Sequence, residues 1–161
     1  MKSPEMIGIC GGIWGNSGVG KTTVVNILAK KLGYYPVSFL EPIKEAAKKY
    51  FDWDGRMNSD SKVLLDRICR MGRTISEDYW MNLTLSKIPK DENIKIVFDD
   101  LWFENEVKMI TSNGGIIFKV TKDGLDSINL PCEMVEIPND GSIINLQTRA
   151  LLIVSEALLS R

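Results

Sequence analysis

The sequence predicts an α/β fold in which a parallel sheet carries helices on both faces. Short apolar runs alternate along the chain with longer segments of helical periodicity, which is typical of parallel strands joined by helices. A glycine-rich turn joins the first apolar run to the first helical segment. The chain has 161 residues, 44% of them hydrophobic, and therefore suits one domain with one sizeable core.

The amino-terminal half is expected to hold two strands and four helices. The first helix places Val24, Ile27 and Leu28 on one face, and Gly33 provides its stop signal. Pro42 suits the first turn of the second helix, and Ser76 is a favourable N-cap for the fourth. The expected strands are 6–14 and 37–40, and the expected helices are 21–32, 42–51, 63–71 and 77–88.

The carboxyl-terminal half is expected to hold three strands and two helices. A polar segment at 121–131 separates the last two strands. The last helix carries one apolar stripe, made of Ile143, Leu146, Ala150, Ile153 and Ala157. The expected strands are 94–98, 116–120 and 134–137, and the expected helices are 103–112 and 142–159.

Composition excludes several classes of function. The formal net charge is −1, so the basic surplus typical of nucleic-acid binding is missing. The three cysteines are scattered and the chain has no histidine, which argues against a zinc site and a disulfide framework. Cys10 lies in an apolar run and is expected to be a small core residue. No apolar run approaches a membrane span, so we expect a cytoplasmic protein that binds neither membrane nor nucleic acid stably.

The glycine-rich turn matches a phosphate-binding loop at every fixed position. It follows the pattern G-x-x-x-x-G-K-[ST], the P-loop or Walker A motif, between an apolar strand and an amphipathic helix. Its glycines let backbone N–H groups surround an anion, and the helix N-terminus adds positive potential. Lys21 can reach the β- and γ-phosphates of ATP, and the Thr22 hydroxyl can ligate Mg²⁺. The expected nucleotide-binding residues are Gly15, Asn16, Ser17, Gly18, Val19, Gly20, Lys21, Thr22 and Thr23.

Two acids follow the strand expected at 94–98. A carboxylate at the carboxyl end of a parallel strand can bind Mg²⁺ directly or through water. We assign Asp99 to the metal and Asp100 to the neighbourhood of the phosphate acceptor. The alternative is a plain helix-capping pair, because aspartate favours that position.

Several cations and aromatic residues are candidates for the acceptor site. Arg67, Arg70 and Arg73 recur at every third residue, and the guanidinium fork suits phosphate. Lys44 follows the second strand, where ligands of such sheets gather. The alternative for these charges is a solvated helix face. Trp80 and Trp102 could stack on a base, although a tryptophan at helical spacing is more often core.

The order of these motifs resembles the deoxynucleoside monophosphate kinases of the type carried by bacteriophages, within the wider P-loop nucleoside and nucleotide kinases. Four stretches carry the likeness, which spans nearly the whole chain. They are Gly15–Thr22, Glu41-Pro42-Ile43-Lys44, Asp78-Tyr79-Trp80, and Phe98-Asp99-Asp100-Leu101-Trp102-Phe103-Glu104-Asn105-Glu106 with Gly114-Gly115 after it. Trp102 and Lys122 depart from the pattern, which has arginine at both places, and Glu41 stands where it has aspartate.

The resemblance implies a three-layer P-loop kinase domain over residues 1–161, with ATP as donor and Mg²⁺ as cofactor. It implies a helical acceptor-binding insertion at about 42–90 and a lid at about 121–131, from which Lys122 reaches the transferring group. The acceptor would be a deoxynucleoside 5′-monophosphate, with its phosphate held by Lys44 and one or more of Arg67, Arg70 and Arg73. The turn 138–141 follows the last strand, so Asn139 is a candidate adenine contact.

Three alternatives remain open at this point. The chain could be another small-molecule P-loop kinase, or a nucleotide-binding module with little catalytic activity. A nucleic-acid motor fits least, because the chain is short and not basic. The sequence leaves the acceptor's base and a homodimeric assembly undecided. An acceptor phosphate is already ionised, so its phosphorylation needs no strong base, which agrees with a chain that lacks histidine.

Overall fold

The computed structural model describes residues 5–13 and 18–161 and divides the chain into two compact units. The core unit is formed by residues 1–37 and 90–161, and the helical unit by residues 38–89. The helical unit overlaps the range 42–90, whose expected part in binding the acceptor stays a prediction. Each unit is described below by itself.

The core unit is built on a five-stranded sheet in the order β2-β3-β1-β4-β5. β1 runs parallel to β3 on one side and to β4 on the other, and β4 runs parallel to β5. Five strands had been expected, and the parallel α/β sheet is confirmed. The bounds are Glu5–Cys10 for β1, Tyr35–Ser38 for β2, Lys95–Asp99 for β3, Ile116–Thr121 for β4 and Val135–Pro138 for β5.

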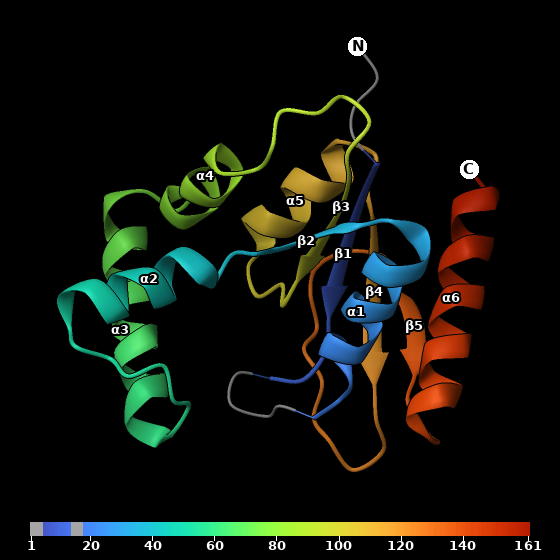
Figure 1. Ribbon diagram of the computed structural model, residues 1–161, viewed down its shortest axis with the longest axis horizontal. Coiled ribbons are helices and arrows are strands. Elements are labelled where there is room, and N and C mark those ends of the chain that lie inside the picture. Colours follow the sequence, from blue (N-terminus) through green and yellow to red (C-terminus); the bar gives the residue numbers. More distant parts are fainter. Residues whose placement is uncertain (1–4, 14–17) are drawn as a thin grey trace. The chain divides into compact units, whose positions relative to one another are not determined.

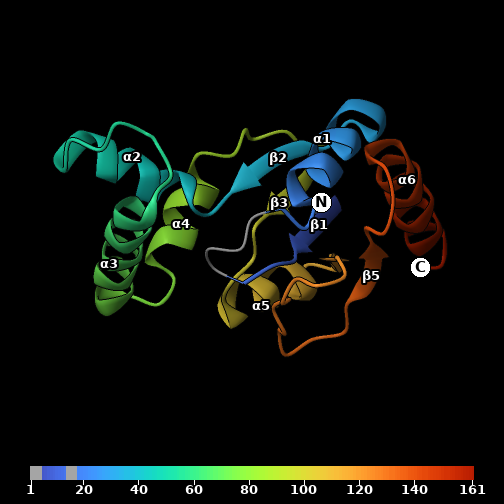
Figure 2. The same ribbon diagram turned by 90° about the horizontal axis from the view of Figure 1, so that it is seen from below.

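Helices cover both faces of this sheet, as the sequence predicts. α1 (Lys21–Leu32) and α6 (Ile143–Leu159) lie on one face, and α5 (Glu104–Ser112) lies on the other (Figures 1 and 2). The connection after β1 leads toward β2, whereas the connection after β4 leads toward β5. Adjacent strands β1 and β4 therefore send the chain in opposite directions. Ligands of open α/β sheets bind at the carboxyl ends of such strands.

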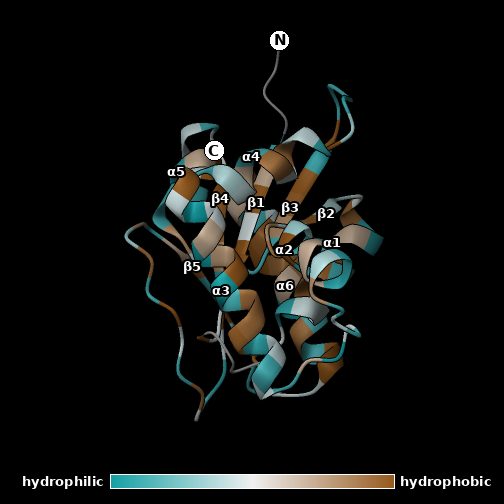
Figure 3. Ribbon diagram, turned by 90° about the vertical axis from the view of Figure 1, so that its left-hand side faces the viewer, coloured by the Kyte–Doolittle hydropathy of each residue, from teal (hydrophilic) through white to brown (hydrophobic). Residues whose placement is uncertain are grey.

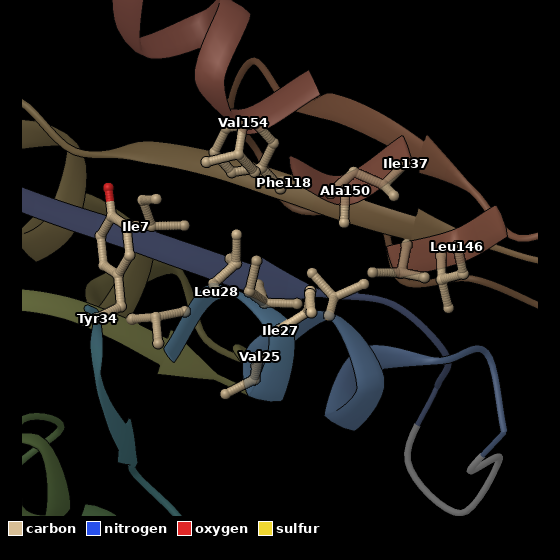
Figure 4. Packing of buried hydrophobic residues seen from close by; sticks show 14 of the residues in the cluster. Ile7, Val25, Ile27, Leu28, Tyr34, Phe118, Ile137, Leu146, Ala150 and Val154 are labelled. Atoms are coloured by element: carbon tan, nitrogen blue, oxygen red, sulfur yellow. The ribbon is translucent and has the colours of Figure 1, made fainter. Parts of the chain in front are cut away.

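The main hydrophobic core lies between the sheet and the pair α1 and α6. Ile7, Phe118 and Ile137 of the sheet are fully buried against Leu28 of α1 and Ala150 of α6. Figure 4 shows Leu146, Ala150 and Val154 of α6 packed in this cluster. The apolar stripe predicted for the last helix therefore faces this core, although Ile143, outside the cluster, is exposed.

The opposite face of the sheet is packed so closely that Gly8 of β1 has no room for a side chain. A Cβ at this position would lie 2.5 Å from Leu101 Cδ1 and 2.7 Å from Ile117 Cδ1. Real Cβ atoms do not approach other heavy atoms this closely. Gly8 therefore lets Leu101, from the turn after β3, reach the sheet.

The helical unit consists of α2 (Glu41–Tyr50), α3 (Ser59–Ile75) and α4 (Tyr79–Ser86). Figure 3 shows hydrophobic and hydrophilic stretches alternating along α3. Its buried residues include Leu65, Ile68 and Gly72. Within the described part of the chain, the longest helices have 17 residues and lack the length and apolarity that a bilayer crossing requires.

Several element bounds differ from the expected ones for local reasons. α3 begins at Ser59 rather than 63, because Asn58 caps it: Ser61 N–H donates to Asn58 Oδ1 at 2.8 Å, and Asn58 N–H donates to Ser61 Oγ at 2.7 Å. α4 begins at Tyr79, with Asp78 rather than Ser76 as its N-cap. β1 ends at Cys10, four residues before its expected end.

Candidate functional site

The carboxyl-terminal half of the predicted phosphate loop lies at the start of α1. Gly18 has φ 113° and Gly20 has φ 108°, both in the region that favours glycine. Lys21 and Thr23 are half-buried in the first turn of the helix, and Thr22 is exposed there. The predictions for Gly15, Asn16 and Ser17 concern positions outside the described residues.

The N-terminus of α1 has the properties of an anion-binding site. Its N-cap is Gly20, which has no side chain to accept hydrogen bonds from the first N–H groups. Within residues 21–32, all of which are described, the first turn of the helix contains no acid. An anion placed there would meet both the N–H groups and the positive end of the helix dipole.

Asn139 supports this loop from the end of β5. Its Nδ2 donates to the Val19 carbonyl at 2.9 Å, and its backbone N–H donates to the Thr121 carbonyl at 2.7 Å. The Val19 side chain is 1% exposed and belongs to the main core. A Cβ on Gly20 would lie 2.9 Å from Asn139 Nδ2. In this structure the Asn139 amide thus contacts the loop backbone, while its predicted contact with adenine stays a prediction.

Lys21 forms an ion pair with Asp100, so the structure brings two of the predicted motifs together. The ammonium Nζ donates to Asp100 Oδ1, and the two side chains are 17% and 27% exposed. The pair forms because β1 and β3 are neighbours in the sheet, which places the loop after β1 beside the end of β3. Asp100 has φ 58°, a left-handed conformation that is uncommon for residues other than glycine.

The turn that carries Asp100 is held at two points. Leu101 N–H donates to the Ile9 carbonyl at 3.1 Å, and the Leu101 side chain is 1% exposed. The N–H groups of Trp102 and Phe103 donate to Glu106 Oε2 at 2.8 and 3.0 Å. Glu106 is only 6% exposed. No role had been predicted for Glu106, although a glutamate three residues after the N-cap of a helix is a capping signal.

Trp102 lies beside the same lysine. The Lys21 ammonium nitrogen is 5.3 Å from the centroid of the Trp102 ring, within the range of a cation–π interaction. Lys21, Asp100 and Trp102 therefore form one contact group, which we call the lysine cluster. Trp102 had been predicted to flank the acceptor's base, and this role remains a prediction.

The residues predicted to hold Mg²⁺ are of a suitable chemical kind. Thr22 offers a hydroxyl oxygen at the start of α1, and Asp99 offers a carboxylate at the end of β3. Among the described residues, no group of three histidine, cysteine or acidic side chains could hold a metal by itself. Mg²⁺ at phosphoryl-transfer sites is bound in this sparse way, by one or two protein oxygens together with substrate phosphates and water. Thr22 and Asp99 thus fit the ion.

The segment expected to act as a lid pairs with the backbone that leads into the phosphate loop. Ile128 N–H donates to the Gly11 carbonyl at 2.7 Å, and Gly12 and Ser127 form an antiparallel bridge. The buried Lys119 of β4 donates to Asn129 Oδ1 at 2.9 Å. Lys122, the predicted phosphate contact of this segment, is exposed. No local pattern in the sequence indicates the hydrogen bond between Lys119 and Asn129.

Cys10 ends β1 and is fully buried, as predicted for a small core residue. Burial raises the pKa of its thiol to about 12, with a further contribution from Cys132. Its Sγ lies 3.6 Å from the Met134 sulfur. The thiol is therefore neutral and unreactive at ordinary pH.

The cationic and aromatic candidates for the acceptor site other than Trp102 all belong to the helical unit. Arg70 donates to Asp66 Oδ2 at 2.8 Å, and this carboxylate raises the pKa of the guanidinium. Arg73 donates to the Glu77 carbonyl at 2.9 Å, and Lys44 lies 3.8 Å from a Glu41 carboxylate oxygen. Arg67 is exposed on α3.

Trp80 has a packing role within the helical unit. Its Nε1 donates to the Cys69 carbonyl at 2.9 Å, and a Cβ on Gly72 would lie 2.3 Å from the same nitrogen. The indole thus fixes α4 against α3. The predicted roles of Lys44, Arg67, Arg70, Arg73 and Trp80 at the acceptor stay predictions.

Comparisons with known proteins agree with the motifs and the fold. No protein-family model matches the chain. A protein of Acanthamoeba polyphaga mimivirus named "Putative deoxynucleotide monophosphate kinase" is 26% identical over 155 residues, covering 78% of this chain and 80% of the relative. The resemblance to deoxynucleoside monophosphate kinases is confirmed by this similarity.

Two solved structures resemble the chain at low sequence identity. A "putative kinase" from Chloroflexus aurantiacus is 13% identical, with a TM-score of 0.52 over 99% of this chain and 98% of that one. A gluconokinase from Sinorhizobium meliloti is also 13% identical, with a TM-score of 0.49 over 98% and 95%. The first of these supports the α/β fold class.

Proposed function

We propose that this chain is a nucleoside monophosphate kinase that transfers the γ-phosphoryl group of ATP to a deoxynucleoside 5′-monophosphate. The observation that carries the proposal is the ion pair between Lys21 and Asp100. It joins the phosphate loop to the acids after β3, which are the two motifs that a phosphoryl-transfer site needs side by side. The similarity to the mimiviral relative supports the nucleotide as acceptor.

In this proposal the loop after β1 holds the triphosphate and Lys21 contacts its β- and γ-phosphates. Thr22 and Asp99 would hold Mg²⁺, which neutralises charge on the transferring group when it is bound. An oxygen of the acceptor phosphate attacks the γ-phosphorus, and the bond to the β–γ bridging oxygen breaks to release ADP. The attacking oxygen is already ionised, so the residues of the chain act by positioning and by charge stabilisation.

The acceptor's phosphate would be bound by cations of the helical unit. Arg67 is exposed and Lys44 is half-buried beside Glu41, so both can take up an anion without losing a buried partner. Arg70 would have to exchange the exposed carboxylate of Asp66 for phosphate. Water screens an exposed ion pair of this kind, so its exchange for phosphate is not opposed by a buried partner.

The direct test mixes the full chain with ATP, Mg²⁺ and each deoxynucleoside monophosphate in turn. We expect a diphosphate to form from at least one of them. Lys21→Ala should lose about 3 kcal/mol of transition-state stabilisation, the scale of removing one charge-stabilising group. The matched control is Lys30→Ala, an exposed lysine in the last turn of the same helix, which should retain wild-type turnover.

A second pair of variants tests the acceptor side. Arg67→Ala should raise the KM for the monophosphate without changing the KM for ATP. Arg56→Ala, an exposed arginine of the same unit that is paired with Asp54, should change neither. If ATP binds but no monophosphate is turned over, the nucleotide-acceptor proposal fails and a different small-molecule acceptor takes its place.

A further inference from the structure

The lysine cluster assigns a task to Trp102 that differs from stacking on a base. The ring lies over the Lys21 ammonium, with 5.3 Å between the nitrogen and the ring centroid. The Lys21 side chain is 17% exposed and has therefore lost most of its contact with water. An ammonium gains more from the negative face of an aromatic ring when it is desolvated in this way.

The backbone around Trp102 fixes where the ring can be. The Leu101 N–H donates a hydrogen bond to the Ile9 carbonyl, and the Leu101 side chain is buried against the sheet. The Trp102 N–H donates a hydrogen bond to the Glu106 carboxylate. Asp100 and Trp102 flank this buried leucine and both contact Lys21. The turn therefore presents a carboxylate and an aromatic face to one ammonium, from a rigid support.

We propose that Trp102 is a positioning residue for Lys21. Its ring, together with the Asp100 carboxylate, holds the ammonium at the N-terminus of α1 before a nucleotide arrives. Lys21 is a flexible side chain, and ordering it when ATP binds would cost side-chain entropy. An ammonium that is already in place avoids this cost, so the ring raises affinity for the triphosphate through Lys21 and not through the base. The inference rests on the proposed function only in taking Lys21 as a phosphate ligand.

A double-mutant cycle on ATP binding tests the coupling between ring and ammonium. The four full-length proteins are wild type, Trp102→Leu, Lys21→Met and the double variant, and calorimetry measures their dissociation constants for ATP. We expect Trp102→Leu to weaken binding about fivefold when Lys21 is present, the scale of one cation–π contact. In the Lys21→Met background the same change should have less than about a twofold effect. Equal losses in both backgrounds would overturn the proposal.

Two further variants separate the ring from bulk and from general damage. Trp102→Phe retains an aromatic face and should recover most of the affinity lost in Trp102→Leu. Trp53→Leu removes another half-buried tryptophan, one that lies in the helical unit, and should leave ATP affinity unchanged. A phenylalanine variant as weak as the leucine variant would show that the aromatic face has no part in binding.

A spectroscopic readout tests the contact without any nucleotide. The chain is labelled with 5-fluorotryptophan, and the ¹⁹F resonance of Trp102 is identified by its loss in Trp102→Phe. We expect this resonance to shift in Lys21→Met and to stay in place in Lys30→Met. If the chemical shift of the Trp102 resonance is unchanged in Lys21→Met, the inference is overturned even if the protein is an active kinase. Conversely, failure to phosphorylate any monophosphate refutes the proposed function while leaving both readouts here intact.

Discussion

Glu106 offers the sharpest test of how the turn before α5 is supported. Its carboxylate oxygen Oε2 accepts from two backbone N–H groups, at 2.8 Å from Trp102 and 3.0 Å from Phe103, and the residue is 6% exposed. Hydrogen bonds to a charged group contribute about 1.5–3 kcal/mol each, and roughly half as much when the acceptor is neutral. Glu106→Gln keeps an acceptor oxygen but loses the charge.

The loss of charge at both bonds is therefore expected to lower the free energy of unfolding by about 2 kcal/mol. In a chain of this size each kcal/mol lowers Tm by about 2–4 °C, so Glu106→Gln should melt about 4–8 °C below the wild type. The change should also weaken ATP binding, because the turn that presents Asp100 and Trp102 to Lys21 is loosened. Differential scanning calorimetry and ATP titration measure the two effects.

The matched control is Glu104→Gln, the same chemical change in the first turn of the same helix. The Glu104 side chain is 57% exposed and pairs with Lys108 in a surface ion pair. Such a pair contributes about 0.3–0.5 kcal/mol, so this variant should melt within about 2 °C of wild type. The reasoning is refuted if Glu106→Gln melts no lower than Glu104→Gln.

Three other changes have definite expected outcomes. In Asn139→Asp the side chain cannot donate to the Val19 carbonyl, and it adds negative charge near the phosphate loop. Calorimetry should therefore show ATP binding weakened about tenfold, the effect of about 1.4 kcal/mol. Unchanged ATP affinity would contradict this reasoning. The pKa of Cys10 is raised from 9.0 to about 12 in the folded chain, so the unfolded chain loses this proton first and stability falls as pH rises from 9 toward 12. Thermal melts at pH 8 and pH 10 should therefore show a smaller fall in Tm between the two pH values for Cys10→Ala than for wild type. Equal falls in Tm would contradict this assignment to Cys10. Gly72→Ala forces a Cβ against the Trp80 indole. This variant should destabilise the helical unit by about 1–3 kcal/mol and leave ATP affinity unchanged. A Gly72→Ala variant as stable as wild type would contradict this reasoning, because it would show that the packing around Trp80 can relax.

The sequence predicts the sheet and its helices because their signals are local. The central strands β1, β3 and β4 contain short apolar runs, and the helices carry local signals such as an apolar stripe in α6 or the stop at Gly33 after α1. The predicted ends of helices were wrong where the capping residues form a less common pattern. α3 starts four residues early because Asn58 and Ser61 cap it reciprocally, a pairing without the glutamate that marks a usual capping box.

The composition of the lysine cluster could be predicted only in part. Lys21 and Asp100 were both assigned to the site, yet they are 79 positions apart, and only the neighbouring positions of β1 and β3 bring them together. The contact between Asn139 and Val19 spans 120 positions and depends on β5 lying at the end of the sheet. Such contacts follow from strand order, which the spacing of motifs does not contain.

The lysine cluster explains how the half-buried Lys21 ammonium is stabilised when no nucleotide is bound. An unpaired ammonium with 17% exposure would lose much of its hydration without compensation. Asp100 supplies a compensating charge, and its left-handed backbone at φ 58° turns the chain so that the carboxylate lies beside the ammonium. A strong partner of this kind would also compete with phosphate, because ATP must displace or share it. Trp102 stabilises the ammonium without carrying a negative charge, so it holds Lys21 in place while competing less with the incoming phosphates. A carboxylate alone would hold the Lys21 ammonium in place but would lower the affinity for ATP. With the Trp102 ring as a second partner, the ammonium is held in place and the affinity for ATP is retained.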